Sequence, residues 1–139
     1  MSTTGGSRHL SATYADRFGV GPDDVVQEIG WDDDADSTIS EAIEDAIGAL
    51  LLDDDTTDPC DVVLLWYRDG DGDLVDELVD ASRNLSPGGR VWLLTPGAGS
   101  PGVVPAGVIA ESAQLAGFIS TKADRFGDWQ GSCLAAPKR

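Results

Sequence analysis

The chain has 139 residues, 41% of them apolar and 24% charged, enough to bury one core as a single domain without disulfides or metals. No apolar run approaches the roughly 20 residues that span a bilayer, and no secretion signal follows Met1, so we expect a cytoplasmic protein without membrane contact. The net charge of −16 is uneven: residues 1–80 contain 22 of the 25 acidic residues and three of the nine basic ones. This charge excludes nucleic acid as a natural partner and favours a protein with a basic surface; the alternative is an acidic surface that only keeps the chain soluble.

The first predicted elements follow an N-terminal tail. Residues 1–10 are rich in Ser, Thr and Gly and are expected to be disordered, which leaves residues 11–139 as one α/β domain. A short helix is predicted over residues 11–18, before a break rich in glycine and proline. Residues 25–29 then have the composition of a short strand, which ends at Gly30.

The middle of the chain predicts a helix followed by a buried strand. Thr38 and Glu41 form a capping box, and apolar residues recur at helical spacing from there to Leu51. Residues 53–55 are acidic and would oppose the helix dipole, so they are placed in the outgoing loop. The continuous apolar run over residues 62–67 predicts a strand with both faces covered, at the centre of a parallel sheet.

Two further helices and three strands complete the prediction. A helix over residues 74–85 is stopped by a Pro-Gly-Gly sequence, and residues 91–95 form the next strand. After a loop rich in glycine and proline, a third helix covers residues 105–116, and residues 118–123 and 132–136 form an antiparallel pair. This order predicts a three-layer, Rossmann-like α/β fold whose sheet is mostly parallel, with about five strands and a C-terminal antiparallel hairpin.

No stretch of the sequence has the pattern of a catalytic centre. Cys60 and Cys133 are far apart and not in a metal-binding spacing, so two reduced, partly buried thiols are expected. The sole histidine, His9, lies in the predicted tail, which removes the commonest general base. We therefore predict no catalytic residue, metal or cofactor, and the sequence favours a protein that is not an enzyme.

A candidate binding surface is predicted where two acidic runs follow strands. Because the carboxyl ends of parallel strands meet at one edge of a sheet, both runs should lie together, beside aromatic residues of the kind common in binding sites. The predicted residues are Gly30, Trp31, Asp32, Asp33, Asp34, Tyr67, Asp69 and Asp71. Two alternatives stay open. In the first, the aromatic rings belong to the core. In the second, Asp69, Asp71 and Asp73 start a calcium loop, although Leu74 stands at its sixth position in place of glycine and Asp80 at its twelfth in place of glutamate.

The second half of the chain carries a recognisable arrangement. An apolar run follows Asp61, then a predicted helix, then the turn Leu-Ser-Pro-Gly-Gly-Arg from Leu85 to Arg90 and a strand. This order resembles the fourth strand, the helix after it and the fifth strand of class I S-adenosylmethionine-dependent methyltransferases. Ala116-Gly117-Phe118 and the hairpin are similar to the last helix and strands of that fold. The resemblance covers residues 61–139 and implies a methyltransferase-like sheet.

The first half departs from that family. Its first strand resembles residues 26–30, but Trp31, Asp32 and Asp33 replace the further glycines that allow a close approach to the methionine part of the cofactor. The roughly 30 residues before Asp61 suffice for one crossover helix, whereas the family has two strand and helix units there. The resemblance therefore implies a truncated sheet in which S-adenosylmethionine binding is disfavoured.

A second set of motifs spans nearly the whole chain: residues 25–34, Arg68-Asp69, Gly72-Asp73-Leu74, residues 91–96 and residues 135–138. In these residues the chain resembles an actinobacterial family known as domain of unknown function 3052. This resemblance implies no established activity.

The leading hypothesis is a non-catalytic binding or regulatory protein that acts through protein contact at the acidic surface, aided by an exposed edge of the first strand. One alternative is a divergent methyltransferase-like enzyme, or a sensor of a nucleotide-type ligand, that uses the cleft around Gly30, Trp31 and Tyr67. Another is an acidic decoy that mimics nucleic acid.

Overall fold

A computed structural model of the chain describes residue 14 and residues 16–136. The predicted tail, residues 1–10, and His9 lie outside this part of the chain. Among the residues that are described, no helix combines the length and the apolar character needed to cross a bilayer.

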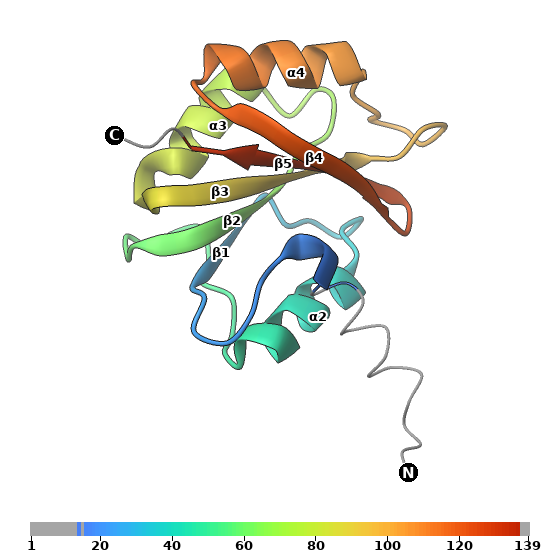
Figure 1. The fold of residues 1–139 in the computed structure, drawn as a ribbon. Helices are drawn as coiled ribbons and strands as arrows, with labels where there is room; N and C mark the ends of the chain where they lie inside the picture. Colours follow the sequence, from blue (N-terminus) through green and yellow to red (C-terminus); the bar gives the residue numbers. More distant parts are fainter. Residues whose placement is uncertain (1–13, 15, 137–139) are drawn as a thin grey trace.

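Five strands form one sheet in the order β1-β2-β3-β5-β4 (Figure 1). The strands β1 (Val26–Ile29), β2 (Cys60–Trp66) and β3 (Leu85–Pro96) pair in parallel. β5 (Trp129–Ala135) lies between β3 and β4 (Ile119–Phe126) and is antiparallel to both. The predicted five-stranded α/β fold and terminal hairpin are therefore present. The sheet is mixed rather than mostly parallel, because the second arm of the hairpin inserts beside β3 and makes two of the four strand pairings antiparallel.

Helices cover both faces of the sheet (Figure 1). The helix α2 (Ser37–Ile47) packs on one face, and α3 (Leu74–Ala81) and α4 (Ala106–Leu115) pack on the other. The N-cap of α2 is Asp36, whose carboxylate accepts a hydrogen bond from the Thr38 backbone N–H at 3.0 Å. The predicted cap at Thr38 was therefore wrong by two residues.

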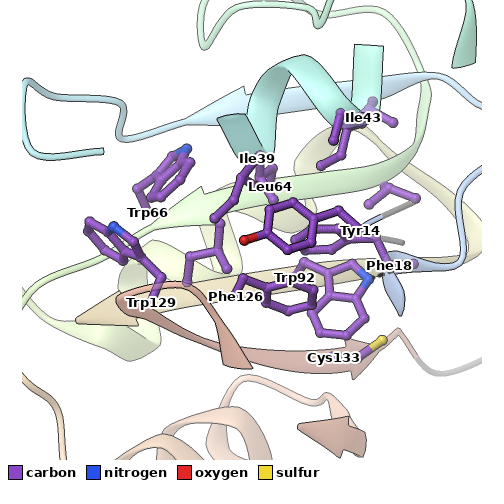
Figure 2. Close-up of a cluster of buried hydrophobic side chains, with 14 of the residues drawn as sticks. Tyr14, Phe18, Ile39, Ile43, Leu64, Trp66, Trp92, Phe126, Trp129 and Cys133 are labelled. Atoms are coloured by element: carbon purple, nitrogen blue, oxygen red, sulfur yellow. Dashed lines mark hydrogen bonds between the residues drawn. The ribbon is translucent and has the colours of Figure 1, made fainter. Parts of the chain in front are cut away.

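The first face is closed by an aromatic cluster in which Tyr14 and Phe18 meet side chains of the last two strands (Figure 2). Phe18 stacks on Phe126 with ring centroids 4.0 Å apart and meets the Trp92 ring edge-on at 5.0 Å. The Trp92 indole N–H also donates to the Phe18 carbonyl oxygen at 2.9 Å. The ion pair between Arg17 and Asp124, at 2.9 Å, holds the same segment against β4. The N-terminal helical residues are thus part of the core.

β2 lies between β1 and β3, in the middle of the parallel part of the sheet, and is buried on both faces, as its apolar run predicts. The centre of the whole five-stranded sheet is β3, not β2 as the sequence predicted. Leu64 and Trp66 contribute to the aromatic face, while Val63, Leu65 and Tyr67 point toward α3 and α4. This alternation follows from the two-residue period of a strand, and it explains why a polar residue would fit at none of these positions.

The outer edge of β1 is not free. The Glu28 backbone N–H donates to the Leu52 carbonyl at 2.8 Å, and the Leu52 N–H donates to the Val26 carbonyl at 2.9 Å. Leu52 thereby forms a one-residue parallel bridge beside Gln27. The prediction of an exposed first-strand edge was wrong over these residues, because the chain returns from α2 along β1 before it enters β2.

Candidate functional site: the acidic rim

The carboxyl ends of β1 and β2 lie together at one edge of the sheet. We call residues 30–34 and 67–71 at this edge the acidic rim. Gly30 has a φ of +83°, and a Cβ added there would lie 2.3 Å from the Trp66 carbonyl oxygen. Only glycine permits this approach, so the first residue of the rim is determined by a backbone crossing inside the fold.

Arg68 joins the two segments of the rim. Its guanidinium donates to the Gly30 carbonyl at 2.7 Å and to both carboxylate oxygens of Asp34, at 2.5 and 3.1 Å. Its backbone N–H donates to the Asp71 carboxylate at 3.0 Å. The guanidinium carbon also lies 5.4 Å from the centroid of the Trp129 ring. One side chain therefore fixes both acidic segments relative to the sheet.

The electrostatics of this contact follow from its burial and its charges. The Arg68 side chain is 13% exposed; burial by itself would lower its pKa, but the hydrogen bonds and charges of Asp34 and Asp71 outweigh burial and raise it. The hydrogen bonds from Arg68 lower the pKa of Asp34. Our sequence reasoning did not assign this role to Arg68. The sequence feature that could have pointed to this role is that Arg68 is the sole basic residue between Arg17 and Arg83.

Trp31 is the exposed aromatic residue of the rim. Its side chain is 46% exposed, and its ring stands edge-on to Trp66 with centroids 5.7 Å apart. Trp66 is itself held by Trp129, at 4.7 Å, and by a 2.9 Å hydrogen bond from its indole N–H to Glu28. Ser40 of α2 donates to the same carboxylate at 2.6 Å. Trp31 therefore presents a half-exposed ring that rests on a rigid base.

Tyr67 does not share this exposed position. Its ring is buried in the cluster beneath α3 and α4, and its hydroxyl donates to the Gly72 carbonyl. Burial, with smaller effects from nearby carboxylates including Asp69 and Asp71, raises the pKa of Tyr67. Of the two aromatic residues predicted for the surface, Trp31 is exposed and Tyr67 is a core residue.

The remaining carboxylates of the rim are exposed. Asp32 accepts a hydrogen bond from the Asp33 backbone N–H at 2.8 Å. Within the described ranges, Asp32, Asp33 and Asp69 form no ion pair with a lysine or arginine, in contrast to Asp34 and Asp71. This leaves uncompensated negative charge around Trp31, an arrangement suited to a cation or a basic side chain.

Two hollows of about 270 Å³ each border the rim. One lies beside Gly30 and Trp31 and is also lined by Asp53 and Asp54. The other is lined by residues from several loops: Asp34, Pro96, Ser100, Pro101, Asp128 and Trp129. Both combine an aromatic ring with carboxylates, so each could receive the end of a basic side chain.

Two of the three aspartates of the suggested calcium loop have other partners. Asp73 caps α3, accepting from the Val75 backbone N–H at 2.8 Å, and Asp71 is engaged by Arg68. In the part of the chain that is described, the one group of three potential ligands within 4.8 Å of one another is residues 53–55, which are exposed and lie in the loop after Leu52. Exposed acidic loops are common without a metal, and this one points to no ligand.

Solved structures show the same fold at low sequence identity. The pyocyanin biosynthetic protein PhzM aligns with a TM-score of 0.68 at 12% identity, over 94% of this chain and 55% of that one. A precorrin-6y C5,15-methyltransferase from Geobacter metallireducens aligns with a TM-score of 0.59 at 13% identity, over 94% and 88%. The chain thus spans about half the length of PhzM. At these identities the likeness concerns the methyltransferase-like fold alone.

Relatives at higher identity come from mycobacteria. Uncharacterised proteins of Mycobacterium tuberculosis and Mycobacterium bovis are each 48% identical over 140 aligned positions, covering 98% of this chain and 89% of theirs. The family described as protein of unknown function DUF3052 matches residues 15–138. The chain belongs to this DUF3052 family.

Proposed function

We propose that the chain is a non-catalytic binding or regulatory protein that uses its acidic rim to hold a basic surface of another protein in the cytoplasm. The observation that carries the proposal is Trp31: a half-exposed indole, fixed from below by Trp66 and surrounded by carboxylates without basic partners. An ordered aromatic ring costs little entropy when a partner covers it, and tryptophan is enriched among residues that dominate binding.

Two physical contributions are expected in such a complex. A lysine or arginine over the Trp31 ring gains about 0.5–2 kcal/mol from the cation–π interaction, more as water is excluded. The exposed carboxylates Asp32, Asp33 and Asp69 act over a longer range, speeding encounter with a basic partner in a way that salt weakens. We expect no role for nucleic acid, membrane or a cofactor.

A capture experiment with matched variants tests the proposal. Immobilised protein is offered to a cell lysate at low and high salt, and the captured proteins are identified. Trp31→Ala should lose the specific partner by at least tenfold, since a central hot spot is worth about 2 kcal/mol or more. The triple variant Asp32→Asn, Asp33→Asn, Asp69→Asn should lose it mainly at low salt.

A second triple variant controls for net charge. Asp23→Asn, Asp58→Asn, Glu111→Gln removes three exposed charges, two of them before the amino ends of β1 and β2 and one on α4, and should bind the partner as the natural chain does. Equal losses in both triple variants would mean that only total charge matters. Capture that resists high salt and survives Trp31→Ala would contradict the proposal outright.

The hollow beside Gly30 and Trp31 favours one alternative, a nucleotide-type ligand sensor or divergent methyltransferase-like enzyme. Calorimetric titration with S-adenosylmethionine and S-adenosylhomocysteine separates the two proposals. We expect no saturable heat, because Trp31 and Asp54 line the hollow and leave little room for the methionine part. Binding that Trp31→Ala or a substitution at Asp54 alters would support the alternative instead.

A further inference from the structure

A groove opens on the face of the sheet that carries α4, beside the antiparallel strands. β4, β5 and the end of β3 form its floor, and α4 with the loop that joins β3 to α4 forms its walls. Figure 1 shows α4 lying above β4 and β5. The groove has a volume of about 550 Å³, within the range of sites that take small organic molecules.

The outer part of the groove is open because two of the three α4 residues that border it are alanines. Ala106 and Ala110 line it from the helix, and Ala123 lines it from β4, which is exposed over most of its length. Val104 and Ile109, each less than a tenth exposed, form the deep apolar wall. A ligand can therefore enter below the level of the protein surface, where a flat protein partner could not follow.

The floor carries polar groups that the protein does not satisfy. Thr95 is 1% exposed, and its hydroxyl makes no hydrogen bond within the described part of the chain. Thr95 lines the groove, and enclosed side-chain nitrogens and oxygens of the described residues otherwise have partners, so a molecule seated in the groove is the partner available to its hydroxyl. The side chains of Ser120, Gln130 and Ser132 line the groove too, again without a hydrogen bond to described residues.

The groove is uncharged although the chain is strongly acidic. Lys122 is the one ionisable residue among the described residues that line it, and its ammonium lies 5.6 Å from the centroid of the Trp92 ring. Trp92 belongs to the aromatic cluster on the opposite face of the sheet, so this charge is turned away. A charged ligand would lose its hydration here without meeting a counterion.

We propose that this groove binds a small, uncharged organic molecule with a flat apolar body and, on one edge, a hydrogen-bond donor beside an acceptor. The body packs against Val104 and Ile109, and the edge meets the Thr95 hydroxyl and the Gln130 amide, each of which can donate and accept. The site uses none of the carboxylates of the acidic rim, so it stands or falls independently of the proposed function.

Amide chemical-shift titration with benzamide tests the proposal, because benzamide is uncharged and carries an N–H beside a carbonyl on a flat ring. We expect saturable shifts at Thr95, Ile109 and Ser132 at millimolar concentrations, and at least tenfold weaker binding of benzoate. Thr95→Val replaces the hydroxyl by a methyl group of similar size. It should weaken benzamide binding about two- to tenfold and leave toluene binding unchanged.

Two variants of α4 serve as a matched pair. Ala110→Leu fills the groove and should abolish benzamide binding, whereas Gln114→Leu adds an apolar side chain outside the lining and should have no effect. The proposal is overturned if the groove shows no saturable shifts, if benzoate binds as well as benzamide, or if Thr95→Val keeps full affinity. It is equally overturned if groove resonances shift with protein concentration alone and Ala110→Leu removes that shift, because a second copy then occupies the groove.

Discussion

Replacing Gly30 by alanine should destabilise the protein much more than the same change at Gly48, although the two backbones are alike. The φ angles are +83° and +75°, both in the left-handed region that favours glycine. A Cβ at Gly48 meets no atom within 4 Å, so only the conformational penalty of about 1 kcal/mol applies there. A Cβ at Gly30 would lie 2.3 Å from the Trp66 carbonyl oxygen, so the ends of β1 and β2 must separate.

That separation determines the size of the effect. Moving Gly30 away from Trp66 breaks the hydrogen bond from the Arg68 guanidinium to the Gly30 carbonyl, 2.7 Å long in the folded chain. A hydrogen bond to a charged group contributes about 1.5–3 kcal/mol. Together with the conformational penalty, we expect a loss of roughly 3 kcal/mol for Gly30→Ala and about 1 kcal/mol for Gly48→Ala.

Urea unfolding followed by circular dichroism, extrapolated linearly to water, measures both values under the same conditions. The two variants should have the same urea dependence as the natural chain and differ in their midpoints. Equal losses of unfolding free energy would refute the reasoning, since the Trp66 carbonyl would then place no constraint on Gly30.

Three further predictions concern charged and titratable groups. Arg68→Met should lower the free energy of unfolding by about 1–2 kcal/mol, because the hydrogen bonds from Arg68 to Gly30 and Asp34 are lost. The loss stays this small because Asp34, 56% exposed, can regain water. No measurable change in urea unfolding would contradict the bridging role. The Arg17 guanidinium lowers the pKa of Asp124 from 3.8 to about 2, so this carboxylate stabilises the fold above its unfolded pKa and that contribution is lost as the pH falls toward 2. Asp124→Asn should flatten the acid-unfolding curve in that window, and an unaltered curve would argue against the ion pair. Burial raises the pKa of Cys60 to about 11, so its thiol should resist a disulfide reagent at about pH 8 until the chain unfolds, whereas rapid reaction of the native protein would show that the thiol is accessible.

Local sequence patterns predict the elements of this fold where burial alone decides them. The apolar run over residues 62–67 became most of β2, which is buried on both faces. The predicted antiparallel pair, residues 118–123 and 132–136, is also present as β4 and β5. The predicted ends of strands were wrong where pairing with a neighbouring strand extended them beyond the apolar residues. β3 was predicted to begin at Val91, but it begins at Leu85, because Leu85 pairs with Cys60 across an irregular register.

The candidate surface was predictable in its location and not in its construction. Strand ends in a parallel arrangement place residues 30–34 near residues 67–71, whatever side chains they carry. The contacts of these residues depend on which face each one takes once the strands are paired. Arg68 forms hydrogen bonds with Asp34, whereas Tyr67 is buried in the core. The two-residue period of the strand does put Tyr67 on the same face as Val63 and Leu65, but no spacing encodes the contact between Arg68 and Asp34.

The contacts that Arg17 and Phe18 make with Asp124 and Phe126 have a consequence for synthesis of the chain. Arg17 and Asp124 are 107 positions apart, so the ribosome must complete most of the protein before either finds its partner. Until then Phe18 and the aromatic face of the sheet stay open to water. Packing of the aromatic face is thus late in folding. During most of translation the nascent chain exposes apolar side chains of the kind that chaperones bind.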